Sequence, residues 1–304
     1  MIIKYLGHST PLEYIVDKFP DGQQQVRFHS TLEHRNQGAY SVVKDIEITT
    51  RLTSFLDVEL LICAVASLRN LGVETIHLHI TYFLGGRYDR QFGNDNHYIK
   101  QVIAPIINSL NFHSVSVLDP HSDVIEACLN NYVVSEANSH YEQYLNFLGH
   151  KLEIEDPDDF ILISPDAGAY KKIYKAAKYL GIPESNIVVC SKVRDGDRLK
   201  VNIDLTTEQM SKRMVVLDDL CDGGGTFLLI AQAINELFKS NESPFSFKGD
   251  LILAVTHGIF SKGFKELNQY YDKIYCTNSY SDIPDYYNNG MEKFKTNVEQ
   301  LEVI

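Results

Sequence analysis

The chain has 304 residues, which is long enough for two α/β domains that each bury a hydrophobic core. Its content of 44% hydrophobic and 22% charged residues is ordinary for a globular protein and argues against a disordered chain. The formal net charge of −12, from 40 acidic and 28 basic residues, disfavours nucleic acid or an anionic membrane surface as a partner.

Five cysteines are spread along the sequence without a Cys-x-x-Cys pair, which argues against a zinc or dithiol redox site. We interpret them as buried free thiols in a reducing compartment. The N-terminus lacks the apolar core of a signal peptide, and no window reaches the roughly 20 apolar residues of a membrane span. The protein is therefore expected in the cytoplasm, or in the host cytoplasm if a phage encodes it.

The first fifty residues differ in pattern from the rest of the chain. Residues 1–50 alternate apolar and polar positions, which is typical of antiparallel β-structure, and Asp21-Gly22 suits a hairpin turn. From residue 55 onward, apolar runs alternate with segments of helical spacing. We expect helices over 55–71, 98–111, 170–180 and 228–238, and strands over 75–83, 115–118, 160–163, 187–190, 215–217, 251–255 and 273–276.

This alternation predicts an α/β fold with parallel sheets that helices cover on both faces. We expect two domains, residues 1–145 and 146–304, with a last helix that packs back on the first domain. In open α/β sheets, ligands bind outside the carboxyl ends of the strands. The polar clusters that directly follow strands are therefore the candidate sites.

The strongest candidate lies between the strand over 215–217 and the helix over 228–238. A strand-loop-helix junction points backbone N–H groups at the helix N-terminus, where the helix dipole favours an anion. Glycines let such a loop approach a phosphate closely, and a threonine hydroxyl adds a donor. The residues concerned are Asp218, Asp219, Asp222, Gly223, Gly224, Gly225 and Thr226.

Two carboxylates at the end of this strand would repel a phosphate unless they bind something else. Ribose hydroxyls or a phosphate-bound magnesium ion are suitable partners for Asp218 and Asp219. The segment therefore predicts a site for a phosphorylated sugar, with its phosphate in a cradle formed by Asp222 to Thr226. The alternative is an acidic strand end followed by a flexible glycine turn.

Further polar clusters follow three other predicted strands. Arg87 and Arg90, on a glycine-hinged loop with Asp89, suit a clamp on a polyphosphate, and a solvated ion-pair loop is the alternative. His121 and Asp166 could hold one Mg²⁺ ion if waters and substrate oxygens completed its shell, although a lone histidine is more often structural.

The polar segment after residue 190 is expected to be a mobile loop. Its Lys192 and Arg194 suit phosphoryl transfer, in which a protein mainly positions groups and stabilises developing charge. A solvated basic loop is the alternative, particularly for Arg198 and Lys200.

The cradle resembles the phosphoribosyl-diphosphate (PRPP) loop of type I phosphoribosyltransferases and PRPP synthetases. Taken with the other clusters, the chain is similar to the PRPP synthetases, or ribose-phosphate pyrophosphokinases, over nearly its whole length. The matching segments outside the cradle are Phe19-Pro20-Asp21-Gly22, Tyr82-Phe83 with Arg87-x-Asp89-Arg90, Asp119-x-His121, Ser164-Pro165-Asp166-Ala167-Gly168, Lys192-x-Arg194 and Thr256-His257-x-Ile259-Phe260-Ser261.

The resemblance implies two doubly wound domains of the type I phosphoribosyltransferase-like kind. It implies transfer of the β,γ-diphosphoryl unit of ATP to the anomeric hydroxyl of ribose 5-phosphate, with release of AMP and a requirement for Mg²⁺. It also implies a homo-oligomer, from dimer to hexamer, with the adenine-contacting loop across a subunit interface. The implied roles are ATP binding by Phe19, Asp21, Gln23, Arg87, Asp89 and Arg90, metal binding by His121 and Asp166, ribose and phosphate binding by Asp166, Asp218, Asp219, Asp222, Gly223, Gly224, Gly225 and Thr226, and catalysis by Lys192 and Arg194.

The chain departs from the family pattern at Gly223, where threonine is usual, and at Gln23, where glutamate is usual. Losing the threonine side chain removes a hydroxyl donor and opens space, which suits an acceptor whose 5-phosphate is itself substituted. Similar phage-type proteins have an Asp-Gly-Gly-Gly-Thr cradle. One such group makes ADP-ribose pyrophosphate from ADP-ribose as a step in the synthesis of NAD. ADP-ribose is accordingly the slightly favoured acceptor, and ribose 5-phosphate is the alternative.

Two other classes of protein share parts of this pattern. A PRPP-consuming phosphoribosyltransferase would have the cradle without the Arg87-x-Asp89-Arg90 or Asp119-x-His121 segments. A non-catalytic regulatory subunit would be expected to lose the Lys192-x-Arg194 pair or the strand-end carboxylates. Because all of these residues are present, the sequence favours an active enzyme.

Overall fold

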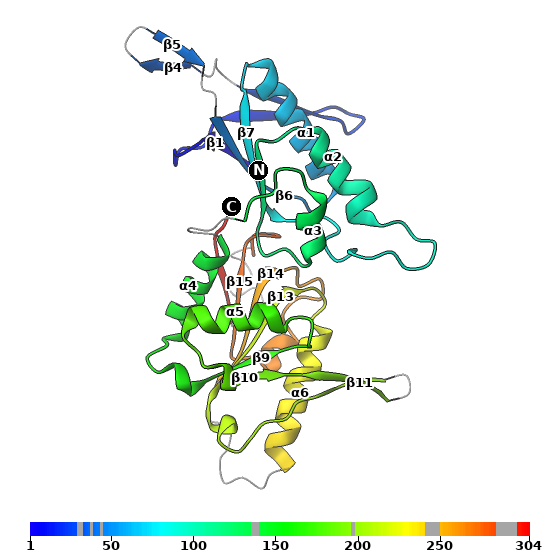
Figure 1. Cartoon of the computed structure of the whole chain (residues 1–304), viewed down its shortest axis with the longest axis vertical. Helices are drawn as coiled ribbons and strands as arrows, with labels where there is room; N and C mark the ends of the chain where they lie inside the picture. Colours follow the sequence, from blue (N-terminus) through cyan, green and yellow to red (C-terminus); the bar gives the residue numbers. More distant parts are fainter. Residues whose placement is uncertain are drawn as a thin grey trace. The chain divides into compact units, whose positions relative to one another are not determined.

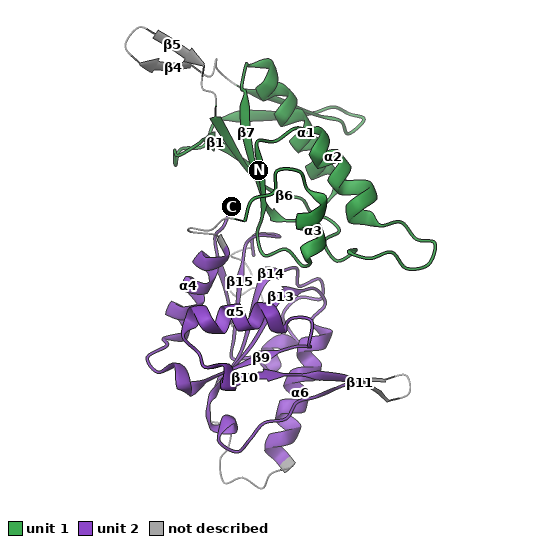
Figure 2. Ribbon diagram, in the orientation of Figure 1, with its two compact units in different colours: residues 1–139, 304 green, residues 140–303 purple. Residues whose placement is uncertain are grey.

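The structure, a computed structural model, describes residues 1–28, 33–36, 39–42, 45–134, 140–195, 198–240, 250–283 and 297–304. The chain divides into two compact units, residues 1–139 with Ile304 and residues 140–303 (Figures 1 and 2). Helix α4 (His140–Leu152), which the spacing did not predict, lies wholly in unit 2, so the expected boundary after residue 145 would cut it. No helix among the described residues is both long and apolar enough to cross a membrane.

Unit 1 contains a four-stranded sheet. In spatial order its strands are β1 (Ile2–Tyr5), β6 (Asp45–Arg51), β7 (Thr75–Tyr82) and β8 (Ser114–Val117). The last three run parallel, whereas β1 pairs antiparallel with β6 at one edge. Ile46, Ile48, Ile76 and Ile80 are fully buried at alternate positions. The sheet is therefore mainly parallel with one antiparallel edge strand.

Two antiparallel hairpins precede β6, as expected for residues 1–50. They are β2 (Tyr14–Lys18) with β3 (Gln24–Phe28), and β4 (Glu33–Asn36) with β5 (Ala39–Val42). Gly22, between β2 and β3, has a φ of +96°, a left-handed conformation that glycine adopts without steric cost. The predicted turn at Asp21-Gly22 is thus confirmed.

The helices of unit 1 follow the predicted spacing, with one addition. Helix α1 (Phe55–Asn70) begins where the Ser54 amide donates to Asp57 Oδ2 over 2.9 Å. The predicted helix over 98–111 is a π-helical turn (Ile99–Ile103) that continues as α2 (Ala104–Ser109). The unpredicted helix is the short α3 (Asp123–Cys128).

Unit 2 contains a six-stranded sheet in which every neighbouring pair is parallel. In spatial order its strands are β10 (Ile187–Val189), β9 (Phe160–Ser164), β13 (Arg213–Cys221), β14 (Leu251–Gly258), β15 (Lys273–Thr277) and β16 (Val298–Leu301). Strands β9 and β14 are buried at every position, as expected for central strands of a covered sheet. Strand β13 extends past its predicted end to Cys221, so Asp218 and Asp219 lie within it.

Helices cover both faces of this sheet (Figure 1). Helix α6 (Gly225–Ser240) contributes Ile230 and Ile234 to the core on one face, while α4 and α5 (Tyr170–Leu180) contribute Leu148 and Ile173 to the core on the other. The predicted doubly wound arrangement is confirmed. The last described element is strand β16, and the expected last helix stays a prediction.

Residues 191–202 form an antiparallel hairpin of β11 (Ser191–Asp195) and β12 (Arg198–Asn202). The prediction of a polar loop here was wrong, because charged residues alternate with Val193, Leu199 and Val201 in the period of a strand. Val201 is buried in the core that α6 also covers. The hairpin is therefore anchored to the body of unit 2.

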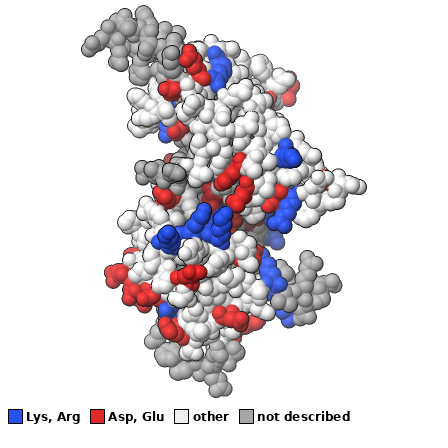
Figure 3. All heavy atoms as spheres, in the orientation of Figure 1, with Lys and Arg blue, Asp and Glu red and all other residues white. Residues whose placement is uncertain are grey.

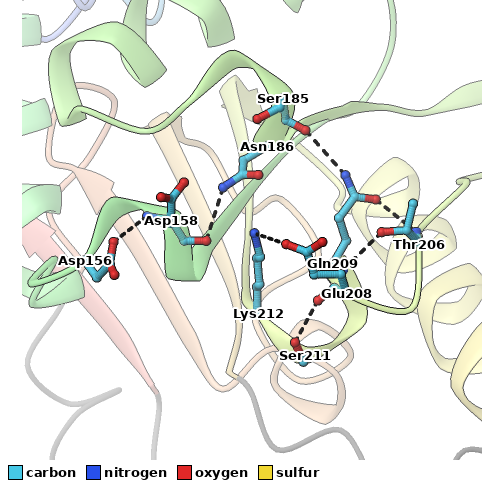
Figure 4. Close-up of polar contacts among 9 residues, drawn as sticks. All are labelled: Asp156, Asp158, Ser185, Asn186, Thr206, Glu208, Gln209, Ser211 and Lys212. Carbon is cyan, nitrogen blue, oxygen red and sulfur yellow. Dashed lines mark hydrogen bonds and ion pairs between the residues drawn. The ribbon is translucent and has the colours of Figure 1, made fainter.

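A polar network ties together the loops that precede β9, β10 and β13 (Figure 4). Asn186 Nδ2 donates to the Asp158 carbonyl over 3.2 Å, and Gln209 Nε2 donates to the Ser185 carbonyl over 3.5 Å. Lys212 pairs with Glu208 over 3.2 Å. These contacts lie at the amino ends of the strands, so the carboxyl ends form the opposite edge of the sheet.

Candidate functional site

The candidate site of unit 2 lies at the carboxyl edge of its parallel sheet. Strands β9, β13 and β14 are neighbours, so the segments that follow them meet at this edge. They carry the polar residues that the sequence singled out: Asp166, Asp218, Asp219, Asp222 and the glycines after it.

The cradle connects β13 to helix α6. Gly224 has a φ of +77°, and its carbonyl accepts the Leu228 amide over 3.0 Å at the start of the helix. No acidic residue lies in the first turn of α6. Its free amides and positive dipole end therefore face the cradle, an arrangement that favours an anion such as phosphate.

The turn after β14 fixes the cradle in place. The amides of Ile259 and Phe260 donate to the Cys221 carbonyl over 2.9 and 3.1 Å. Ser261 donates from its amide to the Asp222 carbonyl over 3.1 Å and from its hydroxyl to Asp222 Oδ1 over 2.7 Å. The predicted Thr256–Ser261 segment thus supports the cradle from behind.

Asp218 and Asp219 form a carboxylate pair beside the cradle, in which Asp219 is buried and Asp218 is half-buried. Asp219 is 5% exposed, and its amide donates to Asp218 Oδ1 over 2.9 Å. Burial and the neighbouring charge of Asp219 raise the pKa of Asp218 well above the ordinary value of a carboxyl group. Hydroxyl donors or a cation would stabilise the ionised form of this pair.

Lys172 is a site residue that the sequence reasoning missed. It lies in the first turn of α5, and its Nζ is 3.7 Å from Asp219 Oδ2. A cation in the first turn opposes the helix dipole, and that unfavourable position was the available signal. Lys172 partly offsets the charge of the carboxylate pair, since it lowers the pKa of Asp218 against the larger raising effects.

Asp166 and Lys192 form a second ion pair at this edge. Lys192 Nζ on β11 lies 2.8 Å from Asp166 Oδ2, and the Gly168 and Ala169 amides donate to Asp166 Oδ1 over 3.0 and 3.2 Å. Although burial raises the pKa of Asp166, the Lys192 ammonium and these amides outweigh burial, so the pKa lies below its ordinary value. Lys192 therefore contacts the strand-end loop from the hairpin. The side chain of Arg194 lies outside the described residues.

The predicted metal ligands lie in different units, His121 in unit 1 and Asp166 in unit 2. Within the described ranges, no three His, Cys, Asp or Glu side chains form a group suited to a metal ion. Both oxygens of Asp166 already accept hydrogen bonds. That His121 and Asp166 share one Mg²⁺ ion stays a prediction, in which substrate oxygens and waters complete the shell of the ion.

The predicted adenine loop of unit 1 is the tip of the β2–β3 hairpin. The Phe19 amide donates to the Gln23 carbonyl over 2.9 Å, and the Gln23 amide donates to Asp21 Oδ1 over 3.2 Å. The Phe19 side chain is 50% exposed at this tip.

The predicted polyphosphate loop follows β7. Its Gly85 has a φ of +73°, and a Cβ atom there would lie 2.2 Å from the Tyr98 ring, so only glycine fits. Arg90 Nε lies 3.6 Å from Asp89 Oδ1, and the Arg90 side chain is mostly exposed, as is Arg87. The loop thus presents two arginines at the surface of unit 1.

His121 follows strand β8 after a strained residue. Asp119 is buried with a φ of +39°, a conformation that non-glycine residues seldom adopt, and His121 is exposed two residues later. Strain of this kind gathers at functional sites.

Basic side chains gather on unit 2 around helix α5 (Figure 3). The helix carries no carboxylate, and its lysines are Lys171, Lys172, Lys175 and Lys178. A local basic surface on a chain of net charge −12 suits an anionic substrate near this edge.

The chain is similar in sequence to several ribose-phosphate pyrophosphokinases. It is 24% identical to that of Mycoplasma genitalium over 296 residues, which is 95% of this chain and 79% of the relative. It is 24% identical to that of Maricaulis maris over 256 residues, which is 81% of this chain and 72% of the relative. No protein-family model matches the chain.

A solved structure has the same fold. The crystal structure of phosphoribosylpyrophosphate synthetase from Mycobacterium smegmatis matches 96% of this chain and 86% of its own, with a TM-score of 0.70 and 17% identity. This match confirms the predicted fold class. The sequence relatives support the predicted resemblance and confirm the enzyme class, a ribose-phosphate pyrophosphokinase-type transferase. The resemblance to phage-type enzymes stays a prediction.

Proposed function

We propose that this chain is an ATP-dependent pyrophosphokinase that acts on a ribose carrying a 5-phosphate. The observation that carries the proposal is the phosphate cradle at the start of α6, which directly follows the carboxylate pair of β13. One element thus offers amides to a phosphate while its neighbour offers carboxylates to hydroxyls. A phosphorylated sugar has a phosphate at one end, for the amides, and hydroxyl groups on its ring, for the carboxylates.

Ribose 5-phosphate is the acceptor that the names of the relatives favour. In this proposal the cradle, Asp222 to Thr226, binds the 5-phosphate, and Asp218 and Asp219 accept hydrogen bonds from the ribose hydroxyls. Lys172 partly neutralises the negative charge of the carboxylate pair before the sugar binds. Asp166 lies at the same edge, near the end of β9, where it would contact the anomeric side of the sugar.

The reaction transfers a diphosphoryl unit from ATP. The anomeric hydroxyl oxygen attacks the β-phosphorus, the bond from that phosphorus to the α,β-bridging oxygen breaks, and AMP leaves with the bond electrons. The hydroxyl proton passes to solvent. Lys192 would stabilise charge on the transferred unit, and its ion pair with Asp166 keeps it at the sheet edge. Arg194, on the same hairpin, is proposed for the same role.

ATP is proposed to bind the polar segments of unit 1. Arg87 and Arg90 would hold its phosphates with Asp89 as their ion-pair partner, and Phe19, Asp21 and Gln23 would contact the adenine. Mg²⁺ would reach the site on the phosphates of ATP and neutralise part of their charge. We further propose a homo-oligomer, from dimer to hexamer, because the half-exposed Phe19 at a hairpin tip suits a contact with a second subunit.

ADP-ribose is the second candidate acceptor. Gly223 supports it, because a glycine adds no side chain to the cradle, although a Cβ atom there would already lie 3.4 Å from Lys262 Cε. The product would then be ADP-ribose pyrophosphate, a compound on a route toward NAD. We propose a location in the cytoplasm with either acceptor.

The test supplies purified protein with ATP, Mg²⁺ and one acceptor at a time, and it measures AMP and the mass of the sugar product. We expect AMP with a diphosphorylated ribose 5-phosphate. AMP with ADP-ribose alone would favour the second acceptor. Pyrophosphate release from PRPP and a base would instead indicate a phosphoribosyltransferase, and the absence of turnover with every acceptor would contradict the proposal.

A further inference from the structure

The room beside Gly223 is not empty. A Cβ atom at Gly223 would lie 3.4 Å from Lys262 Cε and 3.5 Å from Lys262 Cδ. The aliphatic part of the lysine therefore lies in van der Waals contact with the position that the Cβ atom of a larger residue would take. The expectation that Gly223 opens space for a substituent is thus only partly met, because Lys262 takes up some of the space.

The position of Lys262 is fixed by the turn that supports the cradle. Its neighbour Ser261 makes two hydrogen bonds to Asp222, and the Gly263 amide donates to the Phe260 carbonyl over 2.7 Å. Lys262 itself is exposed, and among the described residues no carboxylate lies within ion-pairing distance of it. A lysine held beside an anion site without an ion-pair partner has its charge available for a ligand.

We propose that Lys262 binds the 5-phosphate group of the acceptor and sets the affinity of the cradle for it. This inference rests on the proposed function for the identity of the acceptor, but not for the presence of a phosphate. The ammonium group is bonded to the Cε atom that lies closest to Gly223, so it can reach an anion above the α6 amides. In place of a neutral hydroxyl donor, the cradle then uses a cation, which binds a phosphate by a charge-assisted hydrogen bond.

The experiment compares Lys262→Ala and Lys262→Arg with a control, Lys265→Ala, which removes an exposed lysine from the same surface segment. We expect Lys262→Ala to raise the KM for the acceptor roughly tenfold, a change that corresponds to about 1.4 kcal/mol. The KM for ATP and kcat should change little, Lys262→Arg should restore most of the affinity, and Lys265→Ala should leave all constants unchanged. An unchanged acceptor KM in Lys262→Ala would overturn the inference.

A second variant tests the contact with the cradle directly. Gly223→Thr would add further side-chain atoms to a Cβ atom that already contacts Lys262, so we expect it to displace the lysine and to raise the acceptor KM as well. If both changes act through the same contact, the double variant should be no worse than the poorer single one. Additive effects on the acceptor KM would contradict a shared contact.

Binding measurements separate this inference from the proposed function. Calorimetric titration with ribose 5-phosphate measures the affinity of the cradle for this ligand, whether or not the protein catalyses the reaction. If the protein releases no AMP with any acceptor, while Lys262→Ala weakens ribose 5-phosphate binding roughly tenfold, the proposed function has failed and the inference stands. Equal affinity of both proteins for ribose 5-phosphate would overturn the inference, even if the enzyme is active.

Discussion

Lys172 on α5 places its Nζ 3.7 Å from Asp219 Oδ2 on β13 and so connects the loop after β9 to the carboxylate pair. We expect Lys172→Gln to lower turnover and to shift the acidic limb of the pH–rate profile to higher pH. The physical reason is that Lys172 lowers the pKa of Asp218, so its removal raises that pKa further. The measurement is kcat/KM for the acceptor as a function of pH.

The matched control for this prediction is Lys175→Gln on the same helix, where the lysine is exposed. This variant removes the same charge from the same surface but from the next turn. If Lys175→Gln shifted the profile as much as Lys172→Gln, a general surface charge effect would replace the specific ion pair.

Asp218→Asn should stabilise the free protein and abolish activity. A carboxyl group with a raised folded-state pKa binds more protons in the folded than in the unfolded chain, so its stabilising effect is present at low pH and is lost as pH rises through the folded-state pKa. An amide cannot ionise, and its oxygen can still accept the Asp219 amide hydrogen bond. We expect a gain of about 1 kcal/mol in unfolding free energy at neutral pH, measured by urea denaturation. If Asp218→Asn lowered the free energy of unfolding at neutral pH, the ionised Asp218 would not be destabilising the folded protein.

Lys192→Ala should lower kcat by roughly two to three orders of magnitude, the effect typical of removing one preorganised donor to a transition state. The KM for the acceptor should change little, because Lys192 is not one of the residues proposed to bind the 5-phosphate or the ribose hydroxyls. Steady-state AMP release measures both constants. The control is Lys200→Ala on the paired strand β12. A fall in kcat with both variants would indicate damage to the hairpin instead of a lost catalytic group.

Gly224→Ala should destabilise the fold by about 1–2 kcal/mol, because an L-residue is strained in the left-handed region. The φ of Gly224 is +77°, and a Cβ atom would also lie 3.3 Å from the Leu267 side chain. Gly225→Ala is the control, since nothing lies within 4 Å of a Cβ atom there. Urea denaturation of both variants tests this. Equal stability of the two variants would contradict the backbone account of the cradle.

Much of the fold could be predicted because local patterns determined it. The apolar runs at 160–163 and 251–255 are buried central strands, and the helical spacing at 55–71 and 170–180 matches α1 and α5. Helix α4 escaped prediction because it lies in a segment of mixed composition. The β11–β12 hairpin was mistaken for a loop because the charges of that segment outweighed its period-two alternation.

The site could be predicted only in part, for a related reason. The cradle is one continuous segment, so its residues can be recognised together in the sequence. Lys172 and Lys262 reach the same site from other segments, and only the folded chain brings them to Asp219 and Gly223. The roles assigned to the residues of both units stay predictions.

The most direct measurement of the central claim follows the fate of phosphorus atoms from ATP. The protein is supplied with Mg²⁺, ribose 5-phosphate and ATP that carries a radioactive label on either the α- or the β-phosphorus. We predict that the β-label moves to the sugar and the α-label stays with AMP, and that Asp218→Asn abolishes both. A β-label that remains on ADP, or a sugar that gains no label, would contradict diphosphoryl transfer.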